Sequence, residues 1–556
     1  MIRMSQQFPT KEWRSDTWHR KAARPVTVWM AIFLVAGVTH LWIPEYRWVL
    51  IHIFTLGVLT NSIVLWSQHF TEKFLRQRLP DSARPWQLRR TYLLNAGIVV
   101  TILGEVLVYW WERHWILTQI GAAAVAVALG WHAVVLAQQW LRSEKSKRFR
   151  TAVFAYVLSG FALPVGAVFG ALLSMGLPDE LHLQLLMGHT VINLGGFLGL
   201  AAAGSLTVLF PSIWRINGLK DRSVPMIWLL SIGVVAATVG GILDSGLLAG
   251  GGLMVYAAGW IVGFQAWLTN VLDVAKDPRD RITYPSASIL LAVLWLIGAV
   301  VFYAVQLIAA GSEIYLVDLP TMPLLIGFAA QLLIGVMSYL LPTTMGGGPA
   351  PKRAGLAELN RGGLFRLTLI NLGFIFWQLA DNSWLKVVLS VLVFGSFAAF
   401  VPLLLRSVKS QKAVLLKEKD FPRPEQPTTP WGQVTAGIAV LALILALFGG
   451  LKETGGTAAV APTGTEEVTA VDVRAVGMAF DPAVVEVPAG NQVIITLTND
   501  DAQAHDLKMA SGVQSGRLAE GESMEMDLGV VSADMHGWCT IAGHEIQGMT
   551  FDVVVV

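Results

Sequence analysis

The chain has 556 residues, of which 54% are hydrophobic and only 14% are charged. Soluble domains carry about 25% charged residues, so this composition excludes a soluble multidomain protein. Its 40 lysines and arginines against 38 acidic residues give a net charge of +2, which also excludes a strongly basic nucleic-acid-binding protein.

The amino-terminal segment 1–25 is basic and has no cleavable signal architecture, which predicts a tail that stays in the cytoplasm. Apolar runs of about 20 residues can cross a bilayer. We expect twelve of them to form a helical membrane core over 26–405, followed by a cytoplasmic loop over 406–430 and a thirteenth transmembrane helix over 431–450. The expected spans are 26–44, 48–70, 91–111, 115–138, 151–176, 183–210, 225–242, 249–272, 285–310, 321–343, 366–381, 384–405 and 431–450.

The loops predict the orientation, because short cytoplasmic loops collect lysine and arginine. The loops after the even-numbered spans are basic, as in TEKFLRQRLPDSARPWQLRR, whereas the intervening loops, such as MGLPDELH, are poor in basic residues. We therefore expect an integral protein of the cell membrane with a cytoplasmic amino terminus and an extracytoplasmic carboxyl-terminal part.

The composition changes after the last span. Residues 451–466 are rich in Gly, Thr and Ala and predict a flexible linker. Beyond it, short β-branched runs such as VTAVDVRAVGMAF and NQVIITLTN alternate with Gly, Pro, Asn and Asp. Strands of this length and spacing predict an all-β sandwich over 467–556.

The single cysteine of the chain lies in this β region, in WCTIAGHEIQGM. Cys539, His544 and Met549 have the spacing C-x4-H-x4-M, and His505 lies upstream in NDDAQAHDLKM. A thiolate, two imidazoles and a weak thioether are the ligands of a type 1 (blue) copper electron-transfer site. One cysteine excludes a CxxC motif. His536 is the remaining histidine here, and we expect it to be an exposed rim residue rather than a further ligand.

EVPAGNQVIITLTNDDAQAHDL and GWCTIAGHEIQGM resemble a cupredoxin, in particular the extra cupredoxin of actinobacterial membrane-fused copper nitrite reductase and multicopper oxidase relatives. The cysteine of multicopper oxidases is flanked as His-Cys-His, whereas Trp538 and Thr540 flank Cys539. The chain also lacks the second cupredoxin domain from which copper nitrite reductases build their catalytic site. The resemblance therefore implies an electron carrier rather than a complete oxidase or reductase.

Spans two, six and ten are weakly similar to one another, which predicts a threefold repeat of four helices. Each has an early glycine and a polar residue within the apolar run, namely Asn61, Asn193 and Gln331. The simpler alternative is that apolar helices look alike. The arrangement resembles the catalytic subunit of the haem-copper oxidase superfamily and related nitric-oxide-response membrane proteins. Span seven has no histidine pair and span ten has no His-x-His, so oxygen reduction is not expected.

His52 and His189 lie at similar depths near the outer ends of spans two and six, where they suit two axial ligands of one b-type haem. The alternative is that both only hydrogen-bond within the bundle. His40 and His182 lie at the same level, and a copper or other metal site among these outer histidines is a further alternative. His69 and His132 lie toward the cytoplasm, where we expect packing or interfacial roles.

Glu105 is an ionisable residue inside span three, where such groups are rare and usually face a partner or a cavity. Two roles stand side by side: relay of a proton from a quinol near the outer surface, or pairing with a histidine.

The sequence thus favours a membrane-bound electron-transfer protein. Electrons would pass from a membrane donor, such as quinol through haem, to the type 1 copper and then to an extracytoplasmic acceptor such as a copper nitrite reductase. Two alternatives remain: a copper handling, transport or sensing protein, or a nitric-oxide-binding haem membrane protein. Methionine ladders and cysteines, which transport would favour, are missing from the predicted spans.

Overall fold

The computed structural model describes residues 17–556 apart from 176, 216–220, 276–281, 313, 315–316, 381–382, 422–430, 451–466, 502 and 542–543. The predicted linker 451–466, most of the predicted amino-terminal tail and part of the loop 406–430 therefore lie outside the described residues. The chain divides into two compact units, Met1–Tyr339 and Leu340–Val556.

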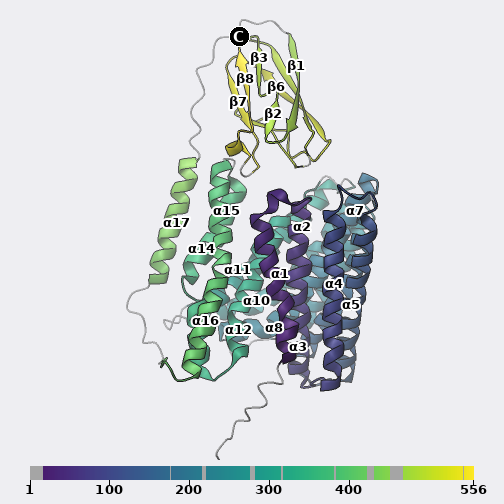
Figure 1. The fold of residues 1–556 in the computed structure, drawn as a ribbon, viewed down its shortest axis with the longest axis vertical. Helices are drawn as coiled ribbons and strands as arrows, with labels where there is room; N and C mark the ends of the chain where they lie inside the picture. Colours follow the sequence, from purple (N-terminus) through teal and green to yellow (C-terminus); the bar gives the residue numbers. More distant parts are fainter. Residues whose placement is uncertain are drawn as a thin grey trace, which may run out of the picture. The chain divides into compact units, whose positions relative to one another are not determined.

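The first unit is helical (Figure 1). Its helices are α1 (Thr17–Val38), α2 (Tyr46–His52), α3 (Asn61–Leu75), α4 (Arg84–Val106), α5 (Trp115–Arg142), α6 (Arg150–Leu173), α7 (Asp179–Thr190), α8 (Leu200–Trp214), α9 (Ser223–Ile242), α10 (Gly246–Ala275), α11 (Tyr284–Ala310) and α12 (Gln331–Met345), the last of which continues into the second unit. The second unit continues with α13 (Pro349–Leu359), α14 (Gly363–Leu379), α15 (Ser383–Ala398), α16 (Phe400–Leu415) and α17 (Trp431–Gly450).

Each of the thirteen expected spans coincides with a helix or a run of helices. Within the described residues, ten helices are long and apolar enough to cross a membrane, or eleven if the bent pair α13–α14 is one span. The expected spans at 91–111 and 431–450 are not among these ten or eleven helices. The first lies on α4, where Arg89, Arg90 and Glu105 reduce the hydropathy, and only Val434–Leu445 of α17 forms a described apolar helix.

On these helices large apolar side chains are exposed and polar amides are buried, the distribution that a lipid environment requires. Large apolar residues such as Val127, Val235 and Phe302 are 60–62% exposed, whereas Gln68 and Gln331 are fully buried. Hydrocarbon covers apolar surface without penalty but cannot hydrogen-bond with amides. The described helices therefore form an integral membrane domain.

The weak repeat has a structural counterpart. Three π-helical turns, η3 (Ile53–Thr60), η5 (Val191–Gly199) and η7 (Pro323–Ala330), each run directly into a 15-residue α-helix, which is α3, α8 or α12. These are spans two, six and ten. The π-helix is rare and often marks functional sites, so its recurrence at three equivalent places favours a real repeat over chance similarity.

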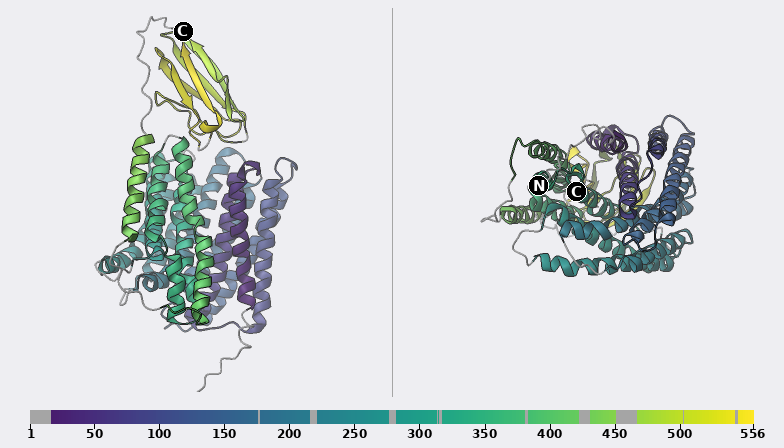
Figure 2. Two further views of the ribbon diagram at one scale, coloured as in Figure 1. Left: turned by 60° about the vertical axis from the view of Figure 1, so that its left-hand side comes forward. Right: turned by 90° about the horizontal axis from the view of Figure 1, so that it is seen from below.

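The β region forms two four-stranded sheets, shown from a second side in Figure 2. One has the order β2-β1-β4-β6 and the other β3-β8-β7-β5. The strands are β1 (Val468–Val476), β2 (Ala479–Asp481), β3 (Val484–Val487), β4 (Gln492–Asn499), β5 (Lys508–Met509), β6 (Ser523–Val530), β7 (Met535–Trp538) and β8 (Thr550–Val555). β4 alternates buried and half-buried residues along its length, as expected of a strand with one face on the core. The predicted sandwich is confirmed.

Candidate metal centre

Strand pairing places the cysteine and the first histidine side by side. β5 pairs with β7 in antiparallel register, with Lys508 opposite Trp538. His505 lies just before β5 and Cys539 directly follows β7, so this short pairing brings together residues that are distant in sequence. His544 follows in the same loop as Cys539, next to the short helix η8 (Glu545–Gln547).

His505, Cys539 and His544 form a cluster in which one ligand atom from each lies within 4.8 Å of the others. The Nδ1 atoms of His505 and His544 are 3.2 Å apart, and Sγ of Cys539 is 3.5 Å from Nδ1 of His544. His505 and Cys539 have no exposed surface, and His544 is 5% exposed. The cluster thus points one sulfur and two nitrogen atoms at a common, buried position.

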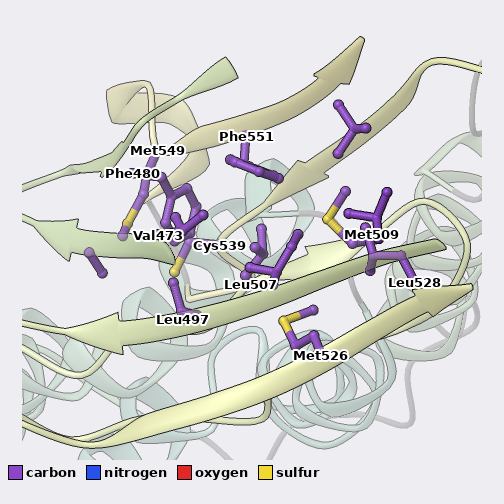
Figure 3. Packing of buried hydrophobic residues seen from close by; sticks show 14 of the residues in the cluster. Val473, Phe480, Leu497, Leu507, Met509, Met526, Leu528, Cys539, Met549 and Phe551 are labelled. Carbon is purple, nitrogen blue, oxygen red and sulfur yellow. The ribbon is translucent and has the colours of Figure 1, made fainter. Parts of the chain in front are cut away.

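Met549 completes the predicted set from the start of β8. Its carbonyl oxygen accepts a hydrogen bond from the Cys539 backbone N–H (3.2 Å). Both side chains are fully buried in the core cluster that also contains Phe480 and Phe551 (Figure 3). The thioether therefore lies in an apolar, water-poor environment beside the cysteine.

Burial controls the protonation of the metal-free ligands. Burial, followed by the nearby Asp506 carboxylate, raises the pKa of the Cys539 thiol to about 12. Burial, followed by the neighbouring His505, lowers the pKa of His544 to about 4. At neutral pH the thiol is protonated and His544 is neutral, so a metal ion that binds here must displace the thiol proton.

Two aspartates that the sequence analysis did not single out hold the ligand segments. Asp501 accepts a hydrogen bond from Nε2 of His505 (3.1 Å). Asp506 accepts from the backbone N–H (2.5 Å) and the hydroxyl (2.7 Å) of Thr540. Asp506 and Thr540 each directly follow a predicted ligand, and this adjacency in the sequence is the feature from which their contact could have been predicted.

His536 lies outside the cluster, as expected of a rim residue. Its side chain is half exposed and its Nδ1 donates to Oδ1 of Asp552 at 2.6 Å.

Within the membrane domain, His52 and His189 lie together, with ring centroids 6.3 Å apart. Nδ1 of His52 donates to the carbonyl of Trp48 and Nδ1 of His189 donates to that of Gly166, both at 2.9 Å. Nε2 is then the unprotonated nitrogen of each ring, the form that iron or copper binds. Nε2 of His189 also lies 3.4 Å from Nδ2 of Asn193, which can donate to it. A Cβ on Gly170 would lie only 3.0 Å from the His189 ring, so glycine permits this close approach of α6.

The other membrane histidines have separate surroundings. His40 donates to the carbonyl of Gly37 at 2.9 Å, and Nε2 of His132 hydrogen-bonds with Oγ of Ser67 at 2.9 Å. His69 packs against Trp66 with ring centroids 5.6 Å apart. These contacts agree with packing roles for His69 and His132.

Glu105 has another carboxylate as its electrostatic neighbour. The charged group that interacts with it is Glu45, whose Oε1 accepts from the Tyr109 hydroxyl at 3.0 Å. No ion pair joins Glu105 to a histidine in the part of the chain that the structure describes.

No protein-family model and no curated protein matches the chain. Among solved structures, it is similar to sodium-dithionite-reduced auracyanin from the photosynthetic bacterium Roseiflexus castenholzii, with 17% identity and a TM-score of 0.16, over 16% of this chain and 98% of that chain. It is also similar to auracyanin B, with 20% identity and a TM-score of 0.15, over 18% of this chain and 96% of that chain.

The described chain combines a helical membrane domain with a carboxyl-terminal domain of two four-stranded β-sheets. The cluster of His505, Cys539 and His544, with Met549 beside it, is consistent with a type 1 copper site.

Proposed function

We propose that this protein is a membrane-bound electron carrier whose β domain holds one type 1 copper ion through His505, Cys539, His544 and Met549. The observation that carries the proposal is the convergence of the thiol and two imidazoles, within 4.8 Å of one another, inside an apolar core. Copper bound by such ligands exchanges single electrons.

The surroundings of the cluster favour electron transfer over catalysis. A catalytic metal site needs an open position for its substrate, whereas this cluster is buried, with no ligand more than 5% exposed. Trp538 and Thr540 flank the cysteine and supply no imidazole for a second metal. The ligands are buried, and hydrogen bonds to Asp501 and Asp506 hold their segments, an arrangement that would keep structural change small when an electron arrives or leaves.

We propose further that electrons enter through a b-type haem held by His52 and His189. Haem would supply a one-electron carrier within the membrane domain. What supports the proposal is the neighbouring pair of imidazoles, each oriented by a backbone carbonyl that leaves Nε2 as the unprotonated ring nitrogen. Their position next to the π-helical turns η3 and η5 agrees with the association of such turns with functional sites.

Under the proposed orientation, the acceptor of the electrons lies on the extracytoplasmic side. A quinol in the bilayer is the donor that we propose, and a soluble copper nitrite reductase on the extracytoplasmic side is the proposed acceptor. The acceptor rests on the cupredoxin resemblance alone. Mixing the reduced protein with such a reductase and nitrite checks it, because reoxidation of the copper must depend on both additions.

The copper site is tested by the absorption spectrum of the full-length protein after loading with Cu(II). We expect an intense thiolate-to-copper band in the visible region that Cys539→Ala abolishes. His536→Ala is the matched control, because it removes a β-domain histidine outside the cluster, and it should leave the band intact. A copper-loaded wild type without this band would contradict the proposal.

The haem site is tested by difference spectra of the purified protein, reduced minus oxidised. We expect a b-type haem signal that is lost in His52→Ala and in His189→Ala but retained in His182→Ala, which removes another histidine at the predicted outer level. A protein that carries no haem would overturn the entry route and leave copper handling as the better account of the β domain.

A further inference from the structure

His505, one of the proposed copper ligands, is hydrogen-bonded to a carboxylate on the side of its ring away from the other ligands. Asp501 accepts a hydrogen bond from Nε2 of His505 at 3.1 Å, while the opposite ring nitrogen, Nδ1, faces His544 at 3.2 Å. The ring is fully buried and the Asp501 side chain is only 21% exposed. A carboxylate in this position fixes the tautomer of a ligand histidine and makes it a better electron donor to the metal.

A second carboxylate joins the two ligand-bearing segments. Asp506 directly follows His505, and both of its oxygens are used by Thr540, which directly follows Cys539. One oxygen accepts from the Thr540 backbone N–H and the other from its hydroxyl. A single side chain thus holds the cysteine segment against the histidine segment. Its carboxylate directly follows His505 in the chain and contacts Thr540, the residue after Cys539.

These two charges act unequally on the two oxidation states of a bound copper. The oxidised site carries one more positive charge than the reduced site, and a nearby carboxylate stabilises the more positive form. The effect is strong because the site is buried and screening by water is weak. Arg517 is the cation that interacts with His544, and it acts in the opposite direction.

We infer that Asp501 and Asp506 are positioning residues that hold the copper ligands and also lower the reduction potential of the site. The inference rests on the proposed type 1 copper. A lower potential makes the reduced copper a more ready electron donor, which suits a carrier that delivers electrons to a partner. Neither aspartate is needed to complete the ligand set, so the two properties can be separated by mutation.

The test uses the copper-loaded full chain and the variants Asp501→Asn and Asp506→Asn. Asparagine has the same shape and can still accept from His505, or accept from the Thr540 N–H while donating to its hydroxyl. Redox titration followed through the visible band should give a higher reduction potential for each variant and the highest for the double variant. Asp527→Asn is the matched control. Asp527 is exposed on β6 and pairs with Ile494, near the start of β4, whereas Asp501 follows the end of β4. The reduction potential of this variant should stay close to that of the wild type.

Conservative replacement separates charge from structure. Asp501→Glu keeps the charge and should return the potential toward the wild-type value. If Asp506→Asn fails to bind copper, Asp501→Asn decides alone. The Asp501 side chain contacts the ligand His505 at Nε2, and its other oxygen accepts from the Gln503 backbone N–H at 3.5 Å. Unchanged potentials in variants that retain the visible band would overturn this inference and leave the copper site standing. Absence of the band in the wild type would instead overturn the proposed function.

Discussion

Cys539 is the residue whose chemistry depends most on its surroundings. Its side chain is fully buried, and burial beside Asp506 raises the pKa of the thiol to about 12. A thiol in this state is a poor nucleophile, so the metal-free protein is protected from thiol reagents. A copper ion can still bind the sulfur, because metal binding displaces the thiol proton.

Copper binding should therefore release about one proton near neutral pH. Cys539 contributes that proton, while His544, with a pKa lowered to about 4, is already neutral. Affinity for Cu(II) should therefore fall as the pH is lowered, by roughly tenfold per pH unit for the thiol proton alone. Calorimetric titration of the metal-free full-length protein in buffers of different ionisation enthalpy measures the released proton. A buffer-independent heat would contradict the prediction.

At the scale of elements, the π-helical turns depend on close approach by a neighbouring helix. Gly57 in η3 and Gly327 in η7 are both the fifth residue of their turns. A Cβ on Gly57 would lie 2.7 Å from the ring of Trp29 in α1, and one on Gly327 would lie 2.6 Å from the ring of Trp295 in α11. The same tryptophan-on-glycine packing thus recurs in two of the three repeats.

Alanine at either glycine should destabilise the membrane domain. Gly57→Ala and Gly327→Ala overfill a packed contact, which typically costs about 1–3 kcal/mol. Gly298→Ala is the matched control, because it lies in α11 one turn from Trp295 and its added Cβ would meet nothing within 4 Å. Thermal unfolding in detergent measures the difference. Equal midpoints for Gly57→Ala and Gly298→Ala would show that this packing does not support the fold.

At the scale of the whole molecule, the distribution of charge determines the proposed orientation. The net charge of +2 conceals basic loops after the even-numbered spans and sparse charge in the loops between them. Under the positive-inside rule, this asymmetry would place the β domain on the extracytoplasmic side, as proposed above. The copper would then face partners outside the cell membrane rather than in the cytoplasm.

The buried state of Cys539 makes this orientation simple to measure. An introduced surface cysteine should be the only thiol in the native protein that reacts quickly. We expect a membrane-impermeant maleimide to label intact cells that carry Ser511→Cys in the β domain, and not those that carry Lys145→Cys in a predicted cytoplasmic loop. Both positions are exposed. Labelling with the opposite pattern would reverse the orientation, and detergent-permeabilised cells, which should label both, are the control.

The sequence determined by itself those features that depend on local composition and spacing. The length of the apolar runs predicted the membrane helices, because a run of about 20 apolar residues is unfavourable in water and long enough to cross a bilayer. The spacing of Cys539, His544 and Met549 predicted three members of one site because they lie on one short segment. The strands predicted from the sequence do not include β5 and β7. These strands have two and four residues, and strands this short show no reliable alternation of polar and apolar residues.

Which distant side chains meet depends on how the strands pair and the helices pack. The pairing of β5 with β7 brings His505 to Cys539, and the same pairing lets Asp506 reach Thr540. The packing of α6 against α7 and η5, together with the turn at η3, places His189 opposite His52. The sequence named His505, His52 and His189 as candidates but not Asp501 or the contacts themselves, because strand register and helix packing are set by contacts between residues far apart in sequence.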